Sequence, residues 1–520
     1  MDYYLILVIA LLILAIADLM VGVSNDAVNF LISAIGSKAA SRSVVFGIAA
    51  AGVFVGASFS SGMMEVARKG IFNPDFFSYA DVMIIFMAVM ITDILLLDLF
   101  NSLGMPTSTT VSIVFEMLGA SVVTGLLAIS ANPEVASSIW EVINYTKASQ
   151  IIAGIFLSVG VAFSIGAIVQ FFTRLLFTFR YEKRLKKYGA FFAGFAISII
   201  VYFMLVKGIK GAAFVTPEVA ESVNNNGLLI VAITFFSSVI LVFFLERVFK
   251  INPLKIVVLL GTFSLAMAFA GNDLVNFIGV PITGYQSYLM WVDSGLAAEE
   301  FMMSKLAKSV SAPPLMLYGA GVIMVLTLWF SAKAKKVTET SVNLGSQGKV
   351  DERFRPNLLS RGIVNSANSF AGFFNGMIPR KATTVVNWRF RSLREDFTDR
   401  PAFDLVRASV NLMIASILIA FASSLKLPLS TTYVSFMVAM GASLADRAWG
   451  EGSAPYRVAG VLNVIGGWFL TAFGAFTAAG VVALCIYFGG FWVAIILFLV
   501  ACFILIRSNV PFALKKVTKN

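Results

Sequence analysis

The chain has 520 residues, of which 59% are hydrophobic and only 13% are charged, and its formal net charge is +11 at pH 7. Soluble domains of average composition carry about 25% charged residues, so this composition excludes a soluble enzyme or a soluble binding domain. The chain has no histidine, which removes the commonest general base and metal ligand. The two cysteines, Cys485 and Cys502, lie in apolar runs and predict neither a disulfide framework nor a metal cluster.

Apolar runs follow one another along the whole chain and determine the predicted fold. They lie near residues 3–35, 44–64, 81–100, 106–129, 149–173, 189–207, 227–247, 254–280, 312–331, 403–424, 428–445, 457–487 and 489–507. A membrane-spanning helix needs about 20 predominantly apolar residues, and the shorter runs suit re-entrant segments. The sequence therefore predicts an all-α polytopic membrane protein with about 12 transmembrane helices.

Basic residues gather in two stretches between these runs. Residues 174–187 contain six Lys or Arg against one Glu, and residues 333–400 contain thirteen Lys or Arg against six acids. A nucleic-acid-binding protein would carry such charge on a folded surface, whereas basic segments between apolar runs are typical of cytoplasmic loops. Since five runs precede the first stretch and four lie between the two, we expect the N-terminus outside and the C-terminus in the cytoplasm. The expected location is the cell (inner) membrane, crossed many times.

Two motifs occur twice in the same order. Asn-Asp-x-x-Asn-Phe occupies residues 25–30 and 272–277, and Pro-x-Ser-Thr-Thr occupies residues 106–110 and 428–432. Because successive apolar runs cross the membrane in alternating directions, the two copies of each motif are expected to point in opposite directions. We therefore expect two inverted-topology repeats.

The repeats divide the chain into four parts. The first repeat covers residues 1–130, and connecting transmembrane helices with the basic loop 174–187 cover residues 131–250. The second repeat covers residues 251–445 and is interrupted by a cytoplasmic insertion at 332–402. Residues 446–520 form the C-terminal transmembrane helices and a cytoplasmic tail.

Inverted repeats of secondary transporters place their binding site near the membrane midplane, on helices that are broken there. Pro106 and Pro428 suit the first turn of a new helix, and the Ser and Thr residues that follow can cap it. Asn and Asp compete for backbone groups and also favour helix ends. We therefore expect broken helices at both motifs.

The polar residues of the motifs suggest the ligands. Ser-Thr-Thr beside a helix N-terminus offers hydroxyl and N–H donors to a tetrahedral anion. Asp26 and Asp273 repel an anion unless they also hold cations, and hard cations favour carboxylate and amide oxygens. A carboxylate can accept a hydrogen bond from protonated phosphate but not from sulfate, which favours cation-coupled phosphate binding. The residues predicted to hold Na⁺ are Asn25, Asp26, Asn29, Asn272, Asp273 and Asn276.

The four motifs NDAVN (25–29), NDLVN (272–276), PTSTT (106–110) and PLSTT (428–432) resemble the duplicated signatures of the inorganic phosphate transporter (PiT) family. The resemblance covers residues from about 3 to 505. It implies symport of inorganic phosphate with sodium or protons. It also implies that phosphate is bound by Asn25, Asp26, Ser108, Thr109, Thr110, Asn272, Asp273, Ser430, Thr431 and Thr432.

The chain departs from the family at Val111 and Tyr433, where many members have histidine after Ser-Thr-Thr, so no imidazole relay can operate. The expected function is import of inorganic phosphate by symport with Na⁺ through alternating access. The alternatives are a proton-coupled phosphate or sulfate permease of the same fold, and a passive anion channel. A passive pore would favour Lys or Arg rings over paired acids.

An enzyme is not expected, because no activating base is evident near the Ser-Thr hydroxyls. The sequence contains no ATP-binding Gly-x₄-Gly-Lys-[Ser/Thr] motif, which points to an ion gradient as the energy source. We therefore expect no cofactor apart from the coupling ion, Na⁺ or H⁺. The expected partners are phosphate, sodium ions and the lipid bilayer; the composition fits a monomer and a homo-oligomer equally, and no nucleic acid is expected.

Other features carry a structural and a functional interpretation. A single Asn or Ser-Thr cluster in an apolar run is usually a contact between helices, and only the mirrored repetition favours a binding site. Four more acids lie in apolar runs and fit a functional role and a structural role equally well: Asp18, Asp93, Asp98 and Glu116. For Lys426, a position at the membrane interface is favoured over attraction of anions. In the insertion, the spacing of Ile363, Ala367, Phe370 and Phe374 predicts an amphipathic helix.

Overall fold

The computed structural model describes most of the chain. The described residues are 2–58, 60, 70–104, 107–131, 136–207, 216–307, 312–331, 334, 401–448 and 454–517, with 358, 360–362, 364–366, 369 and 380–390 from the insertion. Met105 and Pro106 lie outside them, as do the four residues of the predicted amphipathic helix in the insertion.

Within these residues the fold consists of helices, with two isolated β-bridges between Phe72 and Ile143 and between Ser78 and Met302. Nine helices of the described part of the chain are long and apolar enough to cross a membrane. The prediction of an all-α polytopic membrane protein is confirmed, whereas the count of 12 spans stays a prediction. The helices are α1 (Asp2–Gly36), α2 (Arg42–Ala57), α4 (Tyr79–Leu103), α5 (Thr109–Ala131), α6 (Ile139–Val142), α7 (Tyr145–Phe177), α8 (Glu182–Val201), α9 (Pro217–Asn225), α10 (Gly227–Phe249), α11 (Pro253–Ser294), α12 (Pro314–Phe330), α15 (Arg380–Arg389), α16 (Leu405–Ser424), α17 (Thr431–Ala445) and α18 (Ala454–Val517).

One of two regions differs from the expectation. The basic stretch 174–187 is not one loop, because α7 continues to Phe177 and α8 begins at Glu182, so basic residues extend both helices. The last two apolar runs form two helices, together labelled α18, that meet at Gly490, where φ is 61° and the backbone is not helical, in agreement with the expected runs 457–487 and 489–507. The kink is tolerated because glycine lacks the Cβ that disfavours a positive φ.

Helices α1 and α11 carry the two Asn-Asp motifs and run antiparallel through the middle of the bundle. The ring of Tyr4 at the start of α1 lies 5.0 Å from that of Trp291 near the end of α11. At the other end, the rings of Phe30 and Phe269 lie 5.3 Å apart. With 35 residues, α1 extends over about 52 Å at 1.5 Å per residue.

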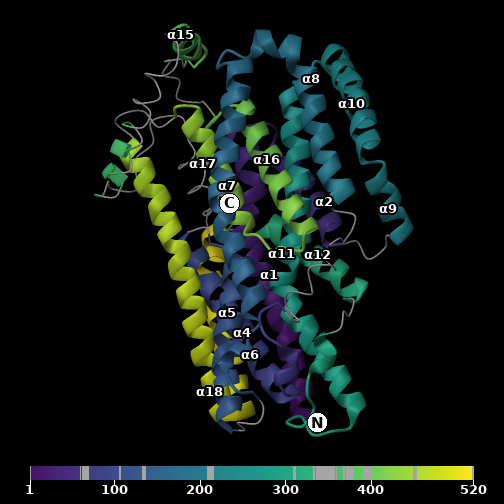
Figure 1. Cartoon of the computed structure of the whole chain (residues 1–520), viewed down its shortest axis with the longest axis vertical. Helices are drawn as coiled ribbons and strands as arrows, with labels where there is room; N and C mark the ends of the chain where they lie inside the picture. The colour runs from purple at the N-terminus through teal and green to yellow at the C-terminus, as the bar shows by residue number, and fades with distance from the viewer. Residues whose placement is uncertain are drawn as a thin grey trace.

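Two helical hairpins flank this central pair and begin at opposite ends of it. The hairpin α4–α5 begins beside the start of α1, where the rings of Tyr79 and Tyr4 lie 5.0 Å apart. The hairpin α16–α17 begins beside the end of α1, where Phe403 packs on Gly36. In Figure 1, α4 and α5 accordingly lie in the lower half and α16 and α17 in the upper half. Each hairpin turn carries one Ser-Thr-Thr motif.

Each hairpin is held by a partner helix at a matching position. Helix α18 packs along α5, and helix α7 packs along α17. Gly119 of α5 lies against the backbone carbonyl of Phe476, and Gly441 of α17 lies against that of Phe163, so a Cβ at either glycine would overlap main-chain atoms. Both glycines follow the serine of their motif by the same interval, 108 to 119 and 430 to 441.

The base of the second hairpin is fixed by ion pairs. Arg174 of α7 is fully buried and contacts Asp404 and Asp446, each at 2.7 Å. Asp404 also caps α16, because its carboxylate accepts a hydrogen bond from the backbone N–H of Arg407. These contacts join α7 to both ends of the α16–α17 hairpin.

The helices that surround this centre expose apolar side chains. In the most apolar 18-residue segment of α10, and likewise in that of α18, only 11% of the residues are buried inside the molecule. Large side chains such as Leu228, Phe236 and Phe473 are more than half exposed. Exposed apolar surface on this scale is typical of contact with lipid.

Candidate functional site

The turns of the two hairpins meet at the centre of the molecule, beside the Asn-Asp motifs of α1 and α11. The Asp26 carboxylate accepts a hydrogen bond of 2.9 Å from the Thr109 hydroxyl and one of 3.0 Å from the Thr432 hydroxyl. Asp26 therefore binds one threonine from each hairpin.

Asp273 makes the matching contacts from α11. Its carboxylate accepts a hydrogen bond of 3.1 Å from the Thr110 hydroxyl and a short one from the Thr431 hydroxyl. Four threonine hydroxyls thus donate to two carboxylates. The sequence prediction that these acids and hydroxyls come together around one centre agrees with this arrangement.

The last asparagine of each Asn-Asp motif reaches the hairpin of the other half. The Asn29 amide donates to the Thr432 hydroxyl at 3.0 Å, and the Asn276 amide donates to the Thr110 hydroxyl at 3.0 Å. The Asn29 carbonyl oxygen accepts a hydrogen bond of 3.2 Å from Ser435. Each half is therefore bonded to the other at its motif residues.

The first asparagines hold the segment that precedes each Ser-Thr-Thr helix. The Asn25 carbonyl oxygen accepts from the backbone N–H of Thr107 at 3.1 Å, and the Asn272 amide donates to the carbonyl of Leu429 at 2.8 Å. These bonds place the hairpin turns against α1 and α11. In this arrangement Asn25 and Asn272 act as positioning residues for the threonines.

Ser108 and Ser430 cap the helices that carry the threonines. The Ser108 hydroxyl accepts from the backbone N–H of Val111, and that of Ser430 accepts from the N–H of Tyr433, both at 3.1 Å. Side-chain oxygens at an N-cap satisfy N–H groups that have no partner within the helix. The cap predicted from the Ser-Thr-Thr motif is thus present in both copies.

The expectation of a break in the helix at the Asn-Asp motifs is wrong. Helix α1 is continuous from Asp2 to Gly36 and α11 from Pro253 to Ser294, with Pro281 inside it. The motif side chains find their hydrogen-bond partners on neighbouring elements and do not need to compete for their own backbone. The helices that begin at the site are α5 and α17.

Two contacts at the site were not predicted. The Asn25 amide donates to Asn101 on α4 at 2.8 Å, and Ser423 on α16 donates to Asn272 at 3.3 Å. Both partners lie five residues before the proline of their motif, 101 to 106 and 423 to 428. Aligning the two copies further upstream would therefore have identified them.

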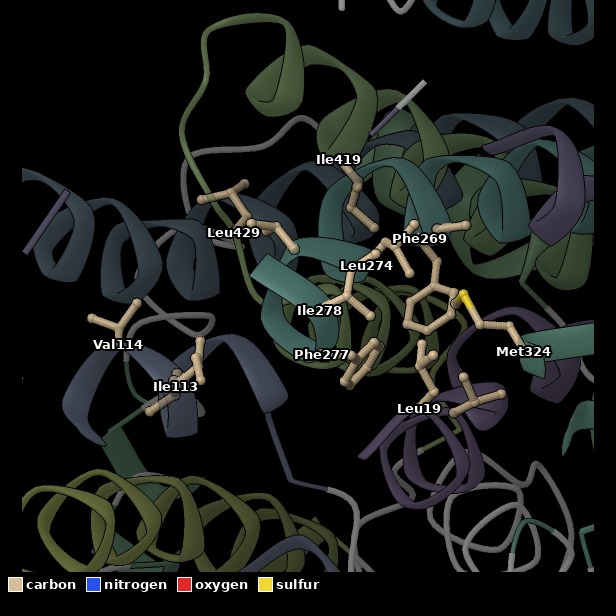
Figure 2. Close-up of a cluster of buried hydrophobic side chains, with 14 of the residues drawn as sticks. Leu19, Ile113, Val114, Phe269, Leu274, Phe277, Ile278, Met324, Ile419 and Leu429 are labelled. Carbon is tan, nitrogen blue, oxygen red and sulfur yellow. The ribbon is translucent and has the colours of Figure 1, made fainter. Parts of the chain in front are cut away.

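The site is closed in this structure. The Asn, Asp, Ser and Thr residues of its motifs are at most 4% exposed. Apolar side chains of α11 adjoin the motif, and Figure 2 shows Leu274, Phe277 and Ile278 grouped close to Phe269 and Leu19. Two carboxylates held in such surroundings need a cation or a proton, because an isolated buried charge is strongly destabilising.

The donor set at the centre suits a hard monovalent cation. Two carboxylates, four hydroxyl oxygens and the side-chain amides of Asn29 and Asn276 lie within one hydrogen-bonded group. Oxygen ligands of this mixed kind are those that hard cations prefer.

Two residues that the sequence analysis singled out lie outside this group. Lys426 is exposed in the α16–α17 connection, and Tyr433 stacks on Trp468.

Known proteins resemble this chain in sequence and in fold. Residues 22–341, more than half of the chain, match the model of the phosphate transporter family. No curated protein matches the chain in sequence. Among solved structures, one described as "The sodium-dependent phosphate transporter" has a TM-score of 0.64 and 20% identity over 93% of this chain and 99% of its own. At this identity the match shows a shared fold.

Proposed function

Because the chain belongs to the phosphate transporter family, we propose that it is a secondary active transporter that imports inorganic phosphate by symport with Na⁺. The observation that carries this proposal is the crossed pattern of contacts at the centre. Asp26 and Asp273 each bind one threonine from each hairpin. Such a site can respond to a cation and an anion together, because the same threonine hydroxyls can contact either ligand.

The cation acts first in this mechanism. The threonine hydroxyls donate their only protons to the carboxylates and have none left for an anion. A Na⁺ ion that binds the carboxylates replaces these bonds and neutralises part of their charge. The hydroxyls can then turn their protons toward phosphate, beside the N-termini of α5 and α17, where free N–H groups and the helix dipole favour an anion.

Coupling follows from this order. Without cations, the two carboxylates repel phosphate and hold the hydroxyl protons. With cations, phosphate finds donors and a less negative site. Asp26 or Asp273 could also accept a hydrogen bond from protonated phosphate, which favours phosphate over sulfate. Na⁺ is favoured as the coupling ion because the solved structure of the same fold is described as a sodium-dependent phosphate transporter.

Alternating access has a physical basis in the two hairpins. The contacts support two inverted repeats, since α1 and α11 are antiparallel and the hairpins begin at opposite ends of α1. Withdrawal of α4–α5 would open the site toward one end of the molecule, and withdrawal of α16–α17 toward the other. We infer that transport alternates between these two movements, in a protein of the cell membrane with its N-terminus outside.

The proposal is tested by uptake of labelled phosphate into proteoliposomes. We expect an inward Na⁺ gradient to drive accumulation, and an excess of unlabelled sulfate to leave it nearly unchanged. Asp75→Asn removes an exposed carboxylate and serves as the matched control for Asp273→Asn. Phosphate flux that is independent of any ion gradient would instead support a passive channel, and accumulation driven by a pH gradient alone would support proton coupling.

A further inference from the structure

Three acids form a second buried group beside the proposed phosphate site. Asp18 lies on α1, Asp93 on α4 and Glu116 on α5, and all three are 0% exposed. Asp18 precedes Asp26 by eight residues on the same helix, a rise of about 12 Å. The group is thus near the central site without sharing its side chains.

Few donors reach the oxygens of this group. Among the described residues, no hydrogen-bond donor of the protein reaches either oxygen of Asp18 or Oε2 of Glu116, and the Ser112 hydroxyl lies beside Asp93. Glu116 Oε1 accepts a hydrogen bond of 2.7 Å from Ser112. The carboxyl groups of Asp18 and Asp93 are within hydrogen-bonding reach of each other, as are those of Asp93 and Glu116. Two carboxyl groups can form such a bond only when one carries a proton.

The helices that carry these acids supply no basic side chain to balance their charges. The segments 2–36 and 79–131, which carry the three acids, contain no Lys or Arg, and α18, packed on α4 and α5, has none between Arg457 and Arg507. The other charged groups nearby are Asp26 on α1 and, through it, Asp273 on α11. Helix α4 also carries Asp98. Along the described residues of α1, α4 and α5, every charged side chain is therefore acidic.

The group also departs from the internal symmetry of the molecule. The positions that correspond to its members in the second half are Leu265, Ala415 and Val438, all apolar. The proposed phosphate site uses equivalent residues from both halves, so these acids are not needed to complete it. Their burial calls for a separate explanation, because three ionised carboxylates in an apolar bundle would be strongly destabilising.

We propose that Asp18, Asp93 and Glu116 form a proton-binding site that makes cation binding at Asp26 dependent on pH. The donor set favours a proton over a metal ion: it contains one hydroxyl and no amide oxygen, and no three acids among the described residues converge as metal ligands do. Shared protons join the three carboxyl groups into one hydrogen-bonded network.

The effect on the central site follows from electrostatics. Loss of a proton from Asp18 places a negative charge about 12 Å from Asp26 along α1. At an effective dielectric constant of about 20, this charge strengthens Na⁺ binding at Asp26 about tenfold. By linkage, Na⁺ binding releases protons from the group. Apparent Na⁺ affinity therefore rises with pH, a step that rests on the proposed function.

The first test measures bound protons directly and needs no transport. Infrared difference spectra between alkaline and mildly acidic buffer are recorded in the phosphate-free, sodium-free protein with Asp26→Asn and Asp273→Asn. We expect a carbonyl band of protonated carboxyl groups that disappears when Asp18→Asn, Asp93→Asn and Glu116→Gln are added. Asp75→Asn serves as the matched control. An unchanged band after the three substitutions would overturn the proposal.

The second test separates a proton from a metal ion. Na⁺ titrations at constant pH follow the same band in the double variant. A band that persists at saturating Na⁺ supports a proton site, whereas a band that Na⁺ removes assigns the group to sodium and overturns the proposal. Thermal unfolding provides the folding control, because amide side chains mimic protonated acids and the three substitutions should leave stability nearly unchanged.

The third test concerns the linkage with Asp26. In the chain with native Asp26 and Asp273, Na⁺ affinity is measured at several pH values, and protons released on Na⁺ addition are measured in weakly buffered solution. We expect the three substitutions to abolish most of the rise with pH, which is about tenfold for titration of Asp18. A full pH dependence in that variant would overturn the linkage. No Na⁺ binding at any pH would contradict the proposed function and leave the infrared result to decide on the proton site.

Discussion

The Asp26 carboxylate on the first helix accepts a hydrogen bond of 3.0 Å from the hydroxyl of Thr432, which lies 406 residues further along the chain. Asp273 makes the corresponding bond of 3.1 Å with Thr110, 163 residues before it. These two bonds cross between the halves of the molecule. They make the central site a joint product of both halves of the chain.

Removal of the Thr432 hydroxyl should impair transport strongly. A hydrogen bond to a charged group contributes about 1.5–3 kcal/mol, so Thr432→Val should lower phosphate uptake by about tenfold to a hundredfold. Thr432→Ser keeps the hydroxyl and should retain most activity. Initial uptake rates in proteoliposomes measure the effect. Since Thr110 occupies the matching place, Thr110→Val should behave alike, and full activity in either valine variant would contradict the crossed site.

Sodium should stabilise the folded protein through Asp26 and Asp273. A ligand that binds only the native state stabilises it by about 2.7 kcal/mol at a hundred times its Kd. We expect the melting temperature to rise with NaCl and not with choline chloride. Asp26→Asn or Asp273→Asn should remove most of this rise, whereas the exposed Asp75→Asn should not. An equal rise in all variants would exclude these acids as sodium ligands.

Gly119 and Gly441 should tolerate no side chain. A Cβ at either position meets a main-chain carbonyl that cannot move aside, so the hairpin must shift from its partner helix. Overpacking of this kind destabilises by about 1–3 kcal/mol, and Gly119→Ala should lower the melting temperature in detergent. Gly160→Ala on α7 is the matched control, because nothing lies near its Cβ position. Equal stability of the two variants would contradict the close contact between α5 and α18.

Acid should weaken the base of the α16–α17 hairpin. Burial alone would raise the pKa of Asp404, but the Arg174 guanidinium outweighs this effect and lowers the pKa below its usual range. A lowered pKa in the folded state contributes stability above the ordinary value of about 4, and this stability is lost as pH falls further. Asp404→Asn keeps the helix cap but removes the ion pair.

Thermal unfolding across acidic pH measures this contribution. We expect the wild type to lose stability as pH falls below about 4, and Asp404→Asn to start lower and to change less over the same range. Arg174→Met should also destabilise the Asp404→Asn protein less than it destabilises the wild type. Parallel curves for wild type and Asp404→Asn would show that Arg174 does not hold this carboxylate.

The sequence alone determined the class of protein and the residues that carry its chemistry. Apolar runs of spanning length predicted the all-α membrane fold, because the interior of a bilayer admits few other structures. The two copies of Asn-Asp-x-x-Asn and Pro-x-Ser-Thr-Thr predicted the acids and hydroxyls that the structure brings together. Their repetition was informative because buried polar groups are destabilising and are rarely kept twice without a use.

Only the tertiary structure decided which of these residues bind one another. A polar side chain in an apolar run needs a partner, but its identity depends on how helices pack, and periodicity does not record it. The sequence thus gave no sign that Asn25 and Asn272 would hold the hairpin turns, or that α1 would stay continuous. The group of Asp18, Asp93 and Glu116 likewise exists only because three helices place its members in contact.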